Sequence, residues 1–201
     1  MMIGKKGDLM KFVKTIVAVL VLVAAAYPQT EDLGMGAFAN EKSDIMLAVD
    51  ASLANASLDK PYILFVVFMA AKSQNQNIVV NRDGVVMVLN GQEYKMPSLE
   101  EWRKDYKGDV WDVTRYRTLA KEGIISSWIR FYEFPSSGDF FPSLQTVSQI
   151  RTDEGSMYSN MGFWSKCYFK NPGLKKGDTL VLRVTAKNKP ELKGEVTVTL
   201  K

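Results

Sequence analysis

Two segments of the sequence place the same residue types at alternate positions: a tryptophan, a basic residue and a tyrosine. The six residues are Trp128, Arg130, Tyr132, Trp164, Lys166 and Tyr168. Alternate side chains of a β-strand lie on one face, so each segment presents its three residues together if it is a strand. Aromatic rings beside cations suit sugar stacking, an anionic glycan or a protein partner. We therefore take these residues as the candidate surface for binding a ligand or partner.

A second interpretation places the same residues beneath a helical insertion, with only the charged ends of the basic side chains reaching water. The stretch from Trp102 to Phe141 holds ten aromatic residues in 40, whereas aromatic residues make up 11% of the whole chain. Aromatic side chains dominate the burial of apolar surface, so this stretch is also expected to supply a small core of its own.

The composition excludes several kinds of catalytic site. The chain has no histidine, which removes Ser-His-Asp and Cys-His machinery and the commonest zinc ligand. Carboxylate chemistry is the remaining option, and its candidates are Glu100, Glu101, Asp109 and Asp112. Carboxylates in a polar stretch are usually solvated, so we predict no catalytic residue, no metal site and no cofactor.

Cys167 is the only cysteine of the chain, so no disulfide can form within it. It alternates with Phe163 and Phe169 in a strand-like segment. We expect a buried free thiol, since such cysteines behave as small apolar residues.

The segment from Met10 to Ala26 has the layout of a secretory signal peptide. Lys11 and Lys14 precede an apolar run of 11 residues that begins at Ile16 and ends in three alanines. A membrane-spanning helix needs about 20 apolar residues, so the run is short for an anchor. We expect cleavage after Ala26 and an extracytoplasmic protein, periplasmic or secreted. An uncleaved anchor is the alternative, and it would be the chain's one contact with the membrane.

Most of the positive charge lies in this leader. The whole chain carries 26 basic and 22 acidic residues, a net charge of +4. Residues 1–26 hold four lysines and one aspartate, which leaves about +1 for the remainder. A nearly neutral domain gives no electrostatic case for binding nucleic acid.

Residues 27–42 show no regular spacing of hydrophobic residues and are expected to form a flexible N-terminal arm. Several later segments have the pattern of β-strands. In the segment DIMLAVD, Ile45, Leu47 and Val49 alternate with other residues. The apolar run from Pro61 to Ala71 reads as a central strand covered on both faces. Asp83-Gly84 and Asn90-Gly91 each lie between strand-like runs and predict two hairpins.

Helices are expected in a short insertion at about residues 97–123. Ser98 and Glu101 have the spacing of a capping box, which predicts a helix starting there. Residues 112–122 are the candidate second helix, and residues 135–160 read as a long loop.

The C-terminal segments GLKKGDTLVLRVTA and KGEVTVTL predict two alternating strands. Leu180, Leu182 and Val184 form one face, and Val196, Val198 and Leu200 form the matching face. These segments resemble the last two strands of immunoglobulin-like modules in exported bacterial proteins. The resemblance covers roughly 30 residues and departs at Leu180, where many such modules have a corner tyrosine. It implies an immunoglobulin-like fold and no particular activity.

Together these features predict a mainly β protein, an antiparallel β-sandwich at residues 43–201 with a short helical insertion. An α+β sheet with helices on one face is the alternative. The expected function is non-catalytic binding of a partner protein or an envelope glycan. Two other functions stay open: a small carboxylate-dependent envelope hydrolase and an assembly subunit of an envelope complex.

Overall fold

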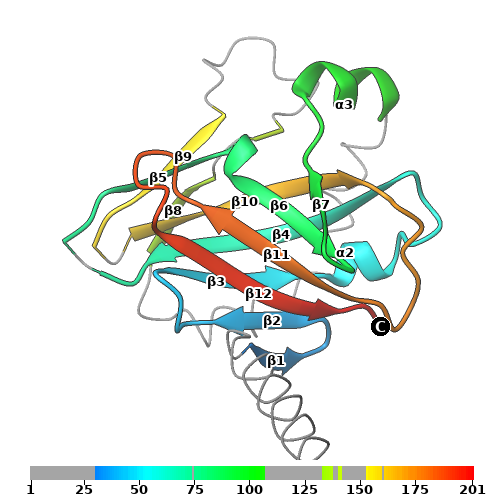
Figure 1. Ribbon diagram of the computed structural model, residues 1–201, viewed down its shortest axis with the longest axis horizontal. Coiled ribbons are helices and arrows are strands. Elements are labelled where there is room, and N and C mark those ends of the chain that lie inside the picture. The colour runs from blue at the N-terminus through cyan, green and yellow to red at the C-terminus, as the bar shows by residue number, and fades with distance from the viewer. Residues whose placement is uncertain (1–29, 74, 107–132, 138–139, 142–152, 160) are drawn as a thin grey trace, which may run out of the picture.

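The fold consists of mainly antiparallel β-sheets packed face to face, with short helices at their margins (Figure 1). It is seen in a computed structural model that describes residues 30–73, 75–106, 133–137, 140–141, 153–159 and 161–201. The predicted fold class, mainly β with a short helix, is confirmed.

The larger sheet has six strands in the order β1-β2-β3-β4-β10-β8. Their bounds are Glu31–Gly34 for β1, Ala37–Asn40 for β2, Ile45–Asp50 for β3, Tyr62–Ala71 for β4, Met161–Lys170 for β10 and Glu133–Ser137 for β8. Neighbouring strands are antiparallel except β8 and β10, which run parallel. The central position of β4, between β3 and β10, explains its continuous apolar sequence, because both of its faces are buried.

The second sheet has four strands in the order β12-β11-β6-β7. Their bounds are Lys193–Thr199 for β12, Thr179–Thr185 for β11, Val85–Leu89 for β6 and Gln92–Lys95 for β7. A separate pair is formed by β5 (Ile78–Asn81) and β9 (Glu154–Met157). The helices are α2 (Ser52–Asn55), the single 3₁₀ turn η1 (Arg82–Gly84) and α3 (Leu99–Asp105).

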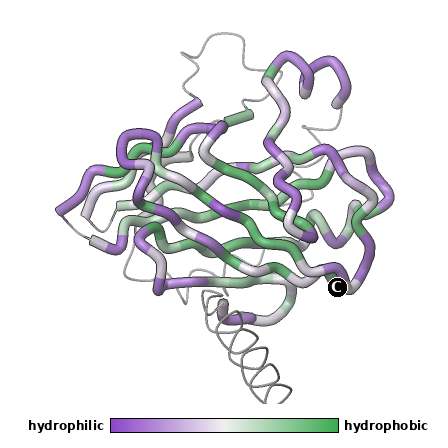
Figure 2. The backbone as a smooth tube through the Cα atoms, viewed as in Figure 1, coloured by the Kyte–Doolittle hydropathy of each residue, from purple (hydrophilic) through white to green (hydrophobic). Residues whose placement is uncertain are grey.

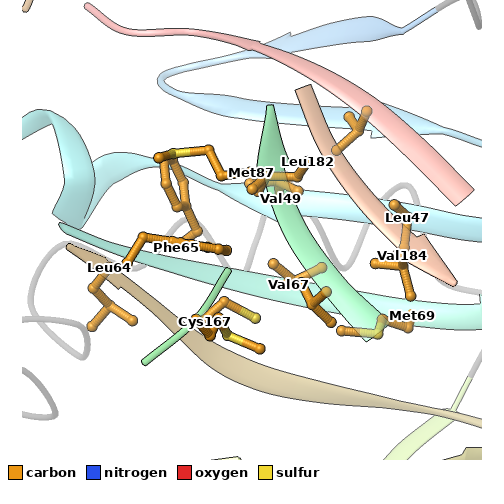
Figure 3. Packing of buried hydrophobic residues seen from close by; sticks show 14 of the residues in the cluster. Leu47, Val49, Leu64, Phe65, Val67, Met69, Met87, Cys167, Leu182 and Val184 are labelled. Atoms are coloured by element: carbon orange, nitrogen blue, oxygen red, sulfur yellow. The ribbon is translucent and has the colours of Figure 1, made fainter. Parts of the chain in front are cut away.

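One hydrophobic core lies between the two large sheets. Figure 3 shows Val49, Phe65 and Met87, from three different strands, meeting in this layer. Figure 2 shows hydrophobic segments along the paired strands and hydrophilic ones at the turns and along α3. Leu182 and Val196 stand opposite each other on β11 and β12, and both are buried as the alternating pattern predicted.

The two sheets are in direct contact where Gly194 of β12 lies against Ile45 of β3. A Cβ atom added to Gly194 would lie 2.3 Å from the backbone oxygen of Ile45, so only glycine fits there. The side-chain amide of Asn40 on β2 donates a hydrogen bond to the backbone oxygen of Glu195 at 2.6 Å. Contacts from β2 and β3 therefore cover the outer edge of β12, which would otherwise be open to pairing with another chain.

The expectation of a flexible arm at residues 27–42 is corrected by β1 and β2, which join the larger sheet. All four residues of β2 are buried, so this segment lacks the polar and apolar alternation that marks a half-exposed strand. Gly34 at the end of β1 and Gly36 in the turn that follows both have positive φ.

One of the two predicted hairpins is confirmed and the other is wrong. Asn90 and Gly91, both at positive φ, connect β6 and β7, as the favoured hairpin turn requires. Asp83 and Gly84 instead lie in η1, and β5 pairs with β9 rather than with β6. The Asn81 side chain accepts a hydrogen bond from the Gly84 amide and caps this turn, which carries the chain from one sheet to another.

The long loop predicted at residues 135–160 is corrected at both ends. Residues 135–137 belong to β8, and Glu154–Met157 form β9. The sequence did not predict β9 because it contains Gly155, and glycine is depleted in strands. A Cβ atom at Gly155 would lie 2.5 Å from the Phe163 ring, so the glycine lets β9 approach β10.

The predicted burial of Cys167 is confirmed: its side chain is fully buried and it forms no disulfide. It lies on β10 in the core, close to Val67 and Met69 of β4 (Figure 3). Burial in apolar surroundings raises the pKa of the thiol far above its ordinary value, because the charged thiolate loses its hydration.

Candidate functional site

The outer face of β10 carries the three described members of the predicted binding surface, Trp164, Lys166 and Tyr168. Lys166 and Trp164 are half-buried, whereas Tyr168 is fully buried. Trp164 stands opposite Phe68 on β4, with ring centroids 6.4 Å apart. The other three members, Trp128, Arg130 and Tyr132, lie outside the described residues.

Tyr168 packs in an aromatic cluster with the helix α3. Its ring centroid lies 5.2 Å from those of Trp102 and Tyr106, and 5.1 Å from that of Phe141. A fully buried ring cannot stack on a ligand, so Tyr168 has a packing role. For Tyr168 alone, this agrees with the second interpretation, in which the helical insertion covers the residue. A ligand-binding role for Trp164 and Lys166 stays a prediction.

The start of α3 is fixed by the predicted capping box, which is confirmed. Ser98 Oγ accepts from the Glu101 amide at 3.1 Å, and Glu101 Oε2 accepts from the Ser98 amide at 2.9 Å. Lys170 on β10 makes ion pairs with Glu101 at 3.5 Å and Asp105 at 3.8 Å. The hydrogen bond from the Ser98 amide, aided by Lys170, lowers the pKa of the Glu101 carboxyl.

The carboxylates considered for catalysis do not form an acid–base pair in the described part of the chain. Glu101 is used by the helix cap and Glu100 is exposed on the same helix turn, while Asp109 and Asp112 lie outside the described residues. Among the described residues, no group of three or more acidic, histidine or cysteine side chains could hold a metal ion.

A groove that the sequence did not predict lies on the outer face of the four-stranded sheet. Its volume is about 430 Å³, and it is open to solvent. Its lining residues come from β5, η1, β6, β7, β11 and β12, and from the turn that joins β11 to β12. They are Asn81, Asp83, Gly84, Val86, Glu93, Lys95, Arg183, Thr185, Ala186, Lys187, Pro190 and Lys193. We call this surface the sheet groove.

Arg183 lies on the floor of the sheet groove and joins three strands. Its Nη1 atom donates to Glu93 on β7 at 2.6 Å, and its Nε atom donates to Glu195 on β12. The hydrogen bond to Glu195 raises the pKa of the guanidinium, which therefore stays charged at any physiological pH. Two carboxylates thus fix the position of this cation.

Two lysines lie on opposite sides of Arg183. Strand pairing aligns Lys95 with Val86, and Val86 with Arg183, in one row across the sheet. Lys193 stands opposite Thr185, at the neighbouring outward position of β11. Both lysine side chains are exposed, and neither ammonium group makes an ion pair or hydrogen bond with any of the described residues.

The walls of the groove are held by the backbone. A Cβ atom at Gly84 would lie 2.5 Å from the Thr185 backbone oxygen, so glycine is required where η1 meets β11. The Lys187 amide donates to the Val79 backbone oxygen at 2.7 Å, and the Asn188 side chain accepts from the Val79 amide at 2.9 Å. The turn after β11 is therefore attached to β5. The Lys187 ammonium pairs with Glu154 on β9, and this hydrogen bond raises the pKa of the lysine.

Part of the sheet groove had a signal in the sequence. Leu180, Leu182 and Val184 were predicted to share one face of this strand, which leaves Arg183 on the opposite, outward face, where its side chain is half-buried. The positions of Lys95 and Lys193 beside Arg183 could not be predicted, because nothing in the local sequence indicates that β6 pairs with β11, about 100 residues later in the chain.

No helix within the described residues is long and apolar enough to cross a membrane. Comparison of the chain with protein-family models, with curated protein sequences and with solved structures gives no significant match.

Proposed function

We propose that this chain is an extracytoplasmic, non-catalytic domain that binds a partner through the sheet groove. One observation carries the proposal: an open groove of about 430 Å³ presents exposed Lys95 and Lys193, without ionic partners among the described residues, on either side of a fixed Arg183. Polar groups that converge in a concavity are the usual mark of a binding site.

The rigidity of the floor supports binding. The outward rows of four hydrogen-bonded strands form it, and core side chains hold those strands from below. A surface whose groups are already in position loses little conformational entropy when it binds. The ion pairs of Arg183 also keep its long side chain in place before any ligand arrives.

The carboxylates in and near the groove support binding over hydrolysis. A general acid must carry a proton near neutral pH. Glu93 and Glu195 each accept a hydrogen bond from Arg183, so both hold that cation in place. Glu101, in α3 and not among the residues that line the groove, has a pKa that is lowered, which is the direction opposite to that of a general acid.

Site-specific photocrosslinking in the source cells tests this proposal. The photoreactive residue p-benzoylphenylalanine replaces Thr185, which lines the groove, or Thr199, which is exposed on the same sheet beyond it. We expect a discrete adduct from position 185 and none from position 199. No adduct at position 185, or equal adducts at both, would contradict binding in the groove.

A further inference from the structure

The charges of the sheet groove indicate the sign of its ligand. Four cations line it, Lys95, Arg183, Lys187 and Lys193, against the two carboxylates Asp83 and Glu93. Lys187 and Arg183 already pair with carboxylates, but Lys95 and Lys193 do not pair with any described residue. A ligand that supplies carboxylates would form ion pairs with these two lysines.

Arg183 adds donors between these two lysines. A guanidinium carries five N–H donors. One goes to Glu195 from Nε and one to Glu93 from Nη1, which leaves three donors without a partner among the described residues. Such donors form strong, charge-assisted hydrogen bonds with a carboxylate.

The spacing of the cations fits an extended polypeptide. Lys95 on β7 and Lys193 on β12 are separated by three strand spacings across the sheet and by two residues along it, about 16 Å between backbones, and the flexible lysine side chains can shorten this span. An extended chain rises about 3.3 Å per residue, so side chains at positions i and i+4 lie about 13 Å apart on the same side. The position between them would lie over Arg183 and Val86, which are paired on β11 and β6.

The lining favours a peptide over a sugar. Sugar rings are commonly recognised by aromatic side chains that stack on them, because such rings offer large flat apolar faces. No aromatic residue is among the described residues that line the groove. Hydrogen-bond donors and cations are what the groove offers, and these match the carboxylates of aspartate and glutamate.

We propose that the sheet groove binds an acidic, extended segment of a partner protein, with carboxylates that bridge Lys95 and Lys193 across Arg183. This inference rests on the proposed function and names its ligand class. An anionic glycan is the competing ligand, and the experiment includes it.

The test measures fluorescence anisotropy of labelled hexaglutamate with the purified exported protein. Hexaglutamine is the uncharged control, and a hexamer of galacturonate represents anionic glycans. The protein variants are Lys95→Gln with Lys193→Gln, and the control Lys175→Gln with Lys176→Gln. The control lysines are exposed in the loop before β11, outside the groove, and their loss changes the net charge by the same amount.

We expect hexaglutamate to bind, hexaglutamine not to bind, and the groove variant to weaken binding by at least about tenfold. The control variant should stay within about twofold of the wild type, which separates a defined site from general charge attraction. A thermal melt checks that both variants are folded.

Three results would overturn the inference: no binding of hexaglutamate, equal losses in both variants, or tighter groove-dependent binding of the galacturonate hexamer. A discrete photocrosslinked adduct at position 185 together with any of these results would leave the proposed function standing and remove only the acidic peptide. Loss of both the adduct and the binding would remove both.

Discussion

The ring of Tyr168 lies against the indole of Trp102, with centroids 5.2 Å apart and planes inclined at 50°. The tyrosine comes from β10 and the tryptophan from α3, so this contact fastens the helix to the outer face of the larger sheet. Both side chains are fully buried. Lys170, two residues after Tyr168, adds ion pairs from the same strand to the same helix.

Replacing Tyr168 with alanine should therefore destabilise the protein strongly. Truncating a buried aromatic side chain costs about 3–5 kcal/mol of unfolding free energy. Trp164→Ala should cost clearly less, because Trp164 is half-buried on the same face. Denaturant melts of the two variants measure both losses of unfolding free energy. Equal losses would show that Trp164 is a core residue as well.

The pKa of Glu101 gives the helix cap a pH dependence. The folded-state pKa lies below the ordinary value of 4.5, because the charged carboxylate accepts from the Ser98 amide and faces Lys170. A lowered pKa contributes stability above the unfolded-state pKa, and this contribution is lost as the pH falls through the folded-state pKa.

Glu101→Gln should therefore lower the melting temperature at pH 7, and the gap to wild type should close at about pH 2. Glutamine can still form the hydrogen bond of the capping box, so the difference in melting temperature measures the effect of the carboxylate charge. Glu100→Gln is the matched control on the same helix turn, and it should give a smaller gap. A gap for Glu101→Gln that persists at low pH would contradict this account.

Much of the local structure was predictable because its causes are local. The capping box at Ser98 needs only residues three apart, and the Asn90-Gly91 turn needs only two residues that tolerate positive φ. The alternation in β11 and β12 was equally clear, because one face of each strand is buried and the other is not.

The errors arose where distant partners decide the outcome. Asp83-Gly84 forms η1 rather than a hairpin because β6 pairs with β11, far along the chain. The strands β2 and β9 lack alternation, since β2 is wholly buried and β9 contains Gly155. The sheet groove depends on the same non-local pairing of β6 with β11, which no local pattern reveals.

Cys167 should react slowly with thiol reagents in the native protein. The thiolate is the reactive form, and complete burial both blocks access and raises the thiol pKa. Labelling should become fast and complete in denaturant, which serves as the control. Fast labelling under native conditions, or a disulfide-linked dimer on a non-reducing gel, would show that the thiol is accessible.

We predict that the protein is exported and that its mature chain begins at Tyr27. The apolar run that ends in Ala24, Ala25 and Ala26 is short for a membrane span and closes with the small residues that a signal peptidase requires. Intact-mass measurement of the protein from the source cells gives the N-terminus directly. A mature chain that still contains Lys11 would indicate a retained anchor.

Binding through the sheet groove is tested most directly by combining the photocrosslinker with loss of the two groove lysines. The yield of the adduct at position 185 is compared between the wild-type background and the Lys95→Gln, Lys193→Gln background, with Lys175→Gln, Lys176→Gln as control. We predict that the adduct falls by at least about tenfold in the groove background and is unchanged in the control. An adduct of equal yield in the groove and wild-type backgrounds would contradict the account.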